Sequence, residues 1–129
     1  MKKLIFLALF VVFGITQAFA TPDEVINHTG CTIVVTPVCY DPATCTITSM
    51  GTSVTVPAGQ TIGITNMPCP YWGYLVCWAG PGCSGTCATV AANAGPFPCP
   101  NFQPIAVLPA CTPCMGATVT FSTGIVEVR

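Results

Sequence analysis

The chain has 129 residues, of which 52% are hydrophobic and only 5% are charged, and its formal net charge is −1. Three basic residues cannot form the clusters of Lys and Arg that nucleic acid or an anionic membrane surface requires, so the composition excludes both partners. Because ion pairs must be scarce, apolar burial and disulfides are expected to stabilise the fold.

The first twenty residues have the three parts of a secretory signal peptide. A basic start at positions 2–3 precedes an apolar stretch at 4–15, and a small-x-small end follows at 18–20. The apolar stretch is too short to be a comfortable membrane span, and no second run of about 18 apolar residues follows it. We therefore predict cleavage before Thr21 and export to the extracellular space or the periplasm.

The predicted mature chain, residues 21–129, has the size of a single domain. It contains all ten cysteines, a density that is typical of disulfide scaffolds in exported proteins. Their even number predicts five disulfides and no free thiol, although their spacing leaves the connectivity open. The cysteines are Cys31, Cys39, Cys45, Cys69, Cys77, Cys83, Cys87, Cys99, Cys111 and Cys114.

Alternation of apolar and polar residues, which is typical of half-buried strands, recurs along this domain. In chain order, strands are expected at 32–38, 44–49, 53–56, 61–65, 71–78, 105–108, 118–122 and 125–128. Turn-forming residues at 41–42, 56–59 and 122–124 predict hairpins. We therefore predict an all-β fold, a small disulfide-stapled antiparallel β-sandwich or barrel of about seven to eight strands.

The segment 79–104 is crowded with Gly, Pro and Cys, and only residues 86–91 have strand character. It is predicted to be a long loop that its disulfides order. Loops of this length inside a compact domain are uncommon and often functional.

Cysteine chemistry other than disulfide formation is not expected. Cys111 and Cys114 have the spacing of a thioredoxin-type redox pair, but no βαβ pattern surrounds them. Zinc bound by these two residues with Cys83 and Cys87 has plausible spacing, yet thiols in an oxidising compartment more often pair. We therefore predict structural cysteines, no metal and no cofactor.

Candidate catalytic residues are few. A hydrolase needs a base with a nucleophile, or two carboxylates placed across a substrate. The chain has one histidine, His28, interpreted as a surface residue, while Asp23 and Glu24 are expected at a frayed start. The chain is therefore predicted not to be an enzyme. The triplet Asn27-His28-Thr29 is also a formal glycosylation acceptor in a eukaryotic host.

The aromatic strand at 71–78 is the candidate ligand-binding surface. Alternate residues of a strand share a face, so Trp72, Tyr74 and Trp78 lie together, opposite the face of Cys77. We expect the cysteine face to be the interior, which would point the three rings outward to stack on sugar rings. The alternative is that these rings fill the core.

These patterns predict a secreted, non-catalytic binding module whose partner is a polysaccharide or another cell-surface ligand. The alternative is an extracellular structural protein that self-assembles. Its support is the low charge and the high apolar content, which reduce electrostatic repulsion between copies.

Overall fold

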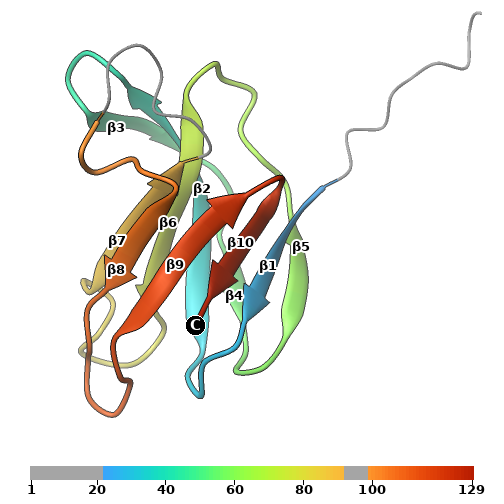
Figure 1. Cartoon of the computed structure of the whole chain (residues 1–129), viewed down its shortest axis with the longest axis vertical. Coiled ribbons are helices and arrows are strands. Elements are labelled where there is room, and N and C mark those ends of the chain that lie inside the picture. Colours follow the sequence, from blue (N-terminus) through green and yellow to red (C-terminus); the bar gives the residue numbers. More distant parts are fainter. Residues whose placement is uncertain (1–21, 92–98) are drawn as a thin grey trace, which may run out of the picture.

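The computed structural model describes residues 22–91 and 99–129, so the predicted signal peptide lies outside the described residues. The described chain is an all-β sandwich of two five-stranded sheets (Figure 1). Its strands are β1 (Asp23–Asn27), β2 (Ile33–Asp41), β3 (Thr46–Met50), β4 (Val54–Val56), β5 (Thr61–Ile64), β6 (Trp72–Trp78), β7 (Cys87–Ala91), β8 (Ile105–Leu108), β9 (Ala117–Ser122) and β10 (Ile125–Val128). The sandwich prediction is confirmed, and all eight expected strands are present together with β1 and β7.

Sheet A has the strand order β5-β1-β10-β9-β8. The predicted hairpin joins β9 to β10, and Gly124 occupies its turn with a φ of 80°, a conformation that glycine adopts without strain. β1 instead pairs with β10 in parallel, with Glu24 opposite Ile125, which is the one parallel pair among the named strands of the described residues. These two strands come from opposite ends of the domain, and no turn between them constrains their relative direction.

Sheet B has the order β3-β2-β6-β7, and β4 also pairs with β2. β4 lies beside residues 33–35 of β2, while β3 lies beside residues 38–41. The predicted hairpin at 56–59 is absent, because β4 belongs to sheet B and β5 to sheet A. This turn crosses between the sheets, which lets Val56 and Ile64 reach one shared core from opposite sides.

The main core lies between the sheets and follows the period-two pattern. In β9, Val119 and Phe121 are buried, whereas Thr118 faces solvent. Where β6 meets β7, the backbones approach so closely that a Cβ on Gly73 would lie 2.2 Å from the carbonyl oxygen of Val90. Glycine is therefore required at this position of the sheet.

A smaller core covers the outer face of sheet B. The rings of Tyr40 and Phe102 stack with centroids 4.0 Å apart and planes 9° from parallel, beside Val38 and Ala91. The segment that carries Phe102 folds over sheet B, where the Cys45–Cys99 disulfide attaches it.

The segment 79–104, predicted to be one long loop, contains strand β7. This strand coincides with the run 86–91 for which strand character was predicted, and it pairs with β6 from Cys77 opposite Cys87 to Gly73 opposite Ala91. The expected single loop is therefore interrupted, and part of it belongs to the sandwich. Residues 92–98 of the segment lie outside the described residues.

All ten cysteines form disulfides. The pairs are Cys31–Cys114, Cys39–Cys69, Cys45–Cys99, Cys77–Cys87 and Cys83–Cys111. This confirms the prediction of five bridges, and it indicates an oxidising compartment.

Candidate functional site

The three aromatic residues predicted to bind ligand face the core. Tyr74 is fully buried, Trp78 is 1% exposed, and Trp72 is partly buried against the same core. The expectation that the cysteine face is interior is therefore wrong, because Leu75 and Cys77 on that face are partly exposed, whereas Tyr74, Val76 and Trp78 on the ring face are buried. Burying the ring face removes more apolar area from water, which explains the choice of face.

The polar groups of the two fully buried rings, Trp78 and Tyr74, form hydrogen bonds inside the protein. The indole N–H of Trp78 donates to the carbonyl oxygen of Pro109 at 2.8 Å, and the hydroxyl of Tyr74 donates to the carboxylate of Asp23. The Tyr74 ring also makes edge-to-face contacts with Trp72 and Phe121. Tyr74 and Trp78 thus present no free face on which a sugar ring could stack.

Asp23 is a structural residue that the sequence interpretation missed. It was placed at a frayed start, whereas the structure buries it at the beginning of β1, in sheet A, bonded to Tyr74 of sheet B. Burial of the phenol, together with the hydrogen bond and the charge of Asp23, raises the pKa of Tyr74 above its ordinary value of 10.0. No local signal reveals this pair, because its members are 51 residues apart.

The predicted surface position of His28 is confirmed. Its Nε2 lies 2.8 Å from Oε1 of Glu127, and Nη2 of Arg129 lies 2.6 Å from the same oxygen. These hydrogen bonds, that of Arg129 foremost, hold the pKa of Glu127 below its ordinary value. The cluster is open to solvent, where ion pairs add little to stability.

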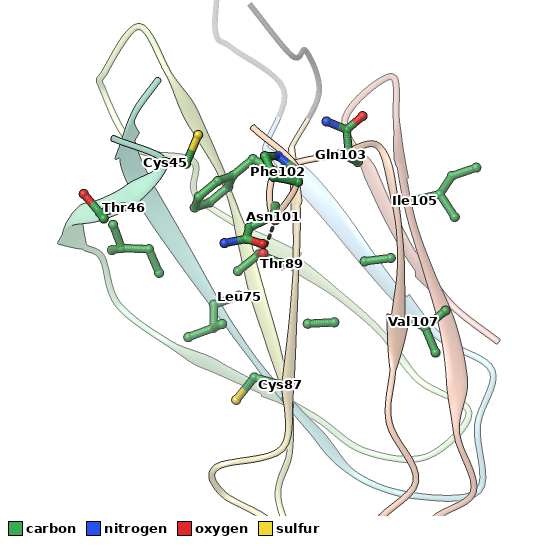
Figure 2. A pocket seen from close by; sticks show the side chains of 14 residues that line it. Cys45, Thr46, Leu75, Cys87, Thr89, Asn101, Phe102, Gln103, Ile105 and Val107 are labelled. Atoms are coloured by element: carbon green, nitrogen blue, oxygen red, sulfur yellow. Dashed lines mark hydrogen bonds between the residues drawn. The ribbon is translucent and has the colours of Figure 1, made fainter. Parts of the chain in front are cut away.

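A groove of about 660 Å³ runs along β7 (Figure 2). Its lining residues are Cys45, Thr46, Ile47, Leu75, Cys87, Ala88, Thr89, Pro100, Asn101, Phe102, Gln103, Ile105, Ala106 and Val107. In Figure 2, residues of β3 and β6 lie on one side of β7, and Ile105 and Val107 of β8 lie on the other. Its volume is within the range of ligand-binding sites.

The groove offers neutral polar groups and aliphatic side chains, since no lining residue is charged and both lining cysteines are in disulfides. The hydroxyl of Thr89 donates to the backbone oxygen of Asn101, and Nε2 of Gln103 donates to the backbone oxygen of Cys99 at 2.7 Å. Among the residues that line it, none can act as a general acid or base near neutral pH.

The segment 99–103, which supplies four lining residues of the groove, is held in place by three kinds of contact. The Cys45–Cys99 disulfide ties the segment 99–103 to the start of β3. Phe102 anchors this segment by its burial in the smaller core. The backbone N–H of Ala91 donates to the carbonyl oxygen of Gln103 at 3.1 Å. The groove is therefore preorganised, which lowers the entropy that a ligand must lose on binding.

The Cys-x-x-Cys motif is not an internal redox pair. Cys111 is bonded to Cys83 and Cys114 to Cys31, while Cys87 is bonded to Cys77. Each sulfur of the redox and zinc arrangements considered from the sequence is therefore in a disulfide, which leaves no thiolate for either chemistry.

The Asn27-His28-Thr29 triplet is a structural connection between the sheets. Asn27 is 1% exposed, and its Nδ2 approaches the carbonyl oxygens of Cys31, Val56 and Pro57 at 2.8, 3.1 and 3.2 Å. Its Oδ1 accepts hydrogen bonds from the backbone N–H and the hydroxyl of Thr29. A glycan on Nδ2 would displace these contacts, so the folded domain cannot carry one there.

Replacement of Asn27 by Ala is expected to destabilise the domain by about 2 kcal/mol or more, because buried carbonyl oxygens lose their donor. Asn66→Ala is the matched control, since Asn66 is exposed, and it should change stability by less than about 0.5 kcal/mol. Thermal or denaturant unfolding measures both changes. Equal stability of the two variants would contradict the structural role of Asn27.

Comparison with protein-family models, with curated proteins and with solved structures found no match to this chain. Within residues 22–91 and 99–129, no helix is long and apolar enough to cross a membrane. The function therefore has to be inferred from the chemistry of the groove, because a fold by itself does not specify one.

Proposed function

We propose that the chain is a secreted, non-catalytic binding module that holds an uncharged polysaccharide of a cell surface in the groove along β7. The observation that carries the proposal is a preorganised groove of about 660 Å³ lined by aliphatic, hydroxyl and carboxamide groups and by no charged group. Neutral sugars present hydroxyls that bond to such polar groups and C–H faces that contact aliphatic walls. The predicted signal peptide and the five disulfides support export.

The groove replaces the aromatic strand as the candidate ligand site. Phe102, the only aromatic residue that lines it, is 2% exposed and already stacks on Tyr40. Binding in the groove would therefore depend on hydrogen bonds and aliphatic contact, so we expect a weak single site. A polymer that presents many equivalent segments would raise the apparent affinity through multivalency.

Ile47→Lys is expected to weaken polysaccharide binding at least about tenfold, which corresponds to about 1.4 kcal/mol. The substitution places an ammonium group in a groove that offers no opposite charge. Met50→Lys is the matched control, because Met50 lies on the same strand and is exposed but does not line the groove. Depletion assays on insoluble cellulose, on chitin and on cell walls of the producing organism measure the binding.

Three results would contradict the proposal. Equal binding by Ile47→Lys and Met50→Lys would exclude the groove as the site. Failure of the unsubstituted mature protein to bind any of these neutral polymers would exclude the ligand class. Release of soluble sugar from the polymers would show that the domain is catalytic.

A second candidate function, self-assembly outside the cell, is favoured by strand β8. Ile105 and Val107 are 62% and 72% exposed on this edge strand of sheet A. Exposed apolar residues on a sheet edge favour pairing with another chain.

A further inference from the structure

Strand β8 leaves one backbone edge unpaired among the described residues. It ends sheet A, where it pairs with β9 alone, with Ile105 opposite Thr120 and Val107 opposite Thr118. In an antiparallel ladder, alternate residues direct both of their backbone groups toward the same neighbouring strand. The register therefore determines which residues of β8 have free groups.

The hydrogen bonds of Thr118 show which residues of β9 direct their backbone groups toward β8 and which direct them away. Its N–H donates to the carbonyl oxygen of Arg129 at 2.7 Å, and the N–H of Arg129 donates back at 3.0 Å, so Thr118 faces away from β8. Val107, opposite Thr118, and Ile105, two residues earlier, therefore direct their N–H and C=O groups away from β9. The two residues with free backbone groups are the two whose side chains are exposed.

Although β8 has only four residues, its edge lacks three other features that prevent pairing with another chain. Natural edge strands are protected by charged side chains, by an internal proline or by a bulge. β8 has the sequence Ile-Ala-Val-Leu, its register with β9 is regular, and its flanking prolines Pro104 and Pro109 lie outside it. A protein with such an edge is expected to cover it with another strand.

We propose that β8 pairs in antiparallel orientation with β8 of a second copy, about a two-fold axis that passes between the two Ala106 residues. Ile105 then lies opposite Val107 of the second copy, and the reverse pair follows by symmetry. Each of these pairs exchanges two backbone hydrogen bonds, so every outward group of both residues is used. The two copies of sheet A become one continuous sheet, which supplies an interface for the self-assembly named above.

This register is preferred because the other symmetric registers lose hydrogen bonds. A shift in one direction sets Val107 opposite Gln103, whose carbonyl oxygen already accepts a bond from Ala91. A shift in the other direction sets Ile105 opposite Pro109, which has no N–H to donate.

Charge supports a second copy as the occupant. Neither β8 nor β9 contains a charged residue, and the acidic residues of sheet A, Asp23, Glu24 and Glu127, lie on β1 and β10. Edge pairing therefore brings no like charges together, and a charged partner would find no counter-charge on this edge. Because β8 borders the groove, the dimer also places two grooves near one axis, and such a pair suits the repetitive ligand of the proposed function.

The dimer is tested by amide hydrogen exchange and sedimentation of the oxidised mature protein over a range of concentrations. At high concentration the amides of Ile105 and Val107 should become protected, whereas those of Ala106 and Leu108, which face β9, should be protected at every concentration. Sedimentation should show a monomer that converts to a dimer. A protein that stays monomeric up to about 1 mM would overturn the proposal. At that concentration sedimentation detects any dimer whose free energy of association exceeds about 4 kcal/mol. Protection of Ile105 and Val107 that is independent of concentration would overturn it as well.

Val107→Pro should abolish the dimer while the fold is retained. The substitution removes an N–H that points away from β9, and proline is tolerated on the edge of a sheet. Val107→Thr keeps this N–H and the branched shape, so it should remain dimeric. Val107→Pro that sediments as the wild type would overturn the proposal, and the exchange experiment decides the question if this variant does not fold.

The proposed function can be separated from this dimer. Ile47→Lys should lose the polysaccharide and still dimerise. Because Val107 also lines the groove, Val107→Pro tests only the dimer, and binding by a single groove is measured on the unsubstituted protein at concentrations where sedimentation shows a monomer. If Val107→Pro is monomeric but Ile47→Lys binds normally, the dimer stands and the groove proposal fails. The reverse pattern leaves the groove and removes the dimer.

Discussion

Removal of the Cys31–Cys114 disulfide is expected to destabilise the domain by about 3.5 kcal/mol, against about 2.7 kcal/mol for Cys77–Cys87. With the other four bridges intact, the first bridge closes a loop of about 25 residues through Cys39–Cys69 and Cys83–Cys111, whereas the second closes a loop of 10. A longer loop restricts the unfolded chain more. Both pairs are replaced by Ser, and denaturant unfolding of the two variants measures the losses. Equal losses, or a larger loss for Cys77–Cys87, would contradict the entropic explanation.

The position of each bridge in the fold gives the same order. Cys31 lies between β1 and β2, and Cys114 lies between β8 and β9, so this bridge links connections that are remote in the sequence. Cys77 and Cys87 are opposite residues of the paired strands β6 and β7. Because a typical domain is stable by only about 5–15 kcal/mol, reduction of all five bridges is expected to unfold the protein.

Replacement of Trp78 by Ala is expected to destabilise the domain by about 3–5 kcal/mol, because it leaves a cavity in the main core. Trp78 is among the largest fully buried side chains and also donates a hydrogen bond to Pro109. Trp72→Ala, at a partly buried position, should cost less. Denaturant unfolding measures both variants.

Tryptophan fluorescence tests the same placement without relying on stability. The emission of Trp78, measured in a Trp72→Phe background, should be blue-shifted and protected from a soluble quencher. Red-shifted, readily quenched emission from a folded protein would show that Trp78 is exposed to solvent. The aromatic strand would then again be a candidate ligand site.

The strands that the sequence identified are those whose pattern is local. In 118–122 and 61–65, apolar and polar residues alternate strictly, and alternation places them on opposite faces wherever the strand lies. β1, with Asp23 and Glu24 at its start, and β7, inside a segment rich in Gly and Pro, lack this alternation. Both are strands because a neighbour supplies their pairing, β10 for β1 and β6 for β7.

The buried face of β6 could not be derived from its sequence, because both faces carry apolar residues. Either face is apolar enough to be buried in the core. One carries Trp72, Tyr74 and Trp78, and the other carries Leu75 and Cys77. Sheet A decided between them, because Phe121 and Asp23 lie where the ring face can contact them. The same limit applies to the turn 56–59, whose residues are suited equally to a hairpin and to a crossing between sheets.

By itself, the sequence determined the all-β class and the complete pairing of the ten cysteines, because these follow from the period of the apolar residues and from the even number of cysteines. The export signal stays a prediction from the sequence. Only the tertiary structure decided the disulfide connectivity and the location of the groove. Residues of the groove come from three separate parts of the chain, which are residues 45–47, Leu75 of β6, and a third part that supplies residues 87–89 of β7 and residues 100–107 with β8. Such a site has no local signature, since its members become neighbours only when the sheets pack.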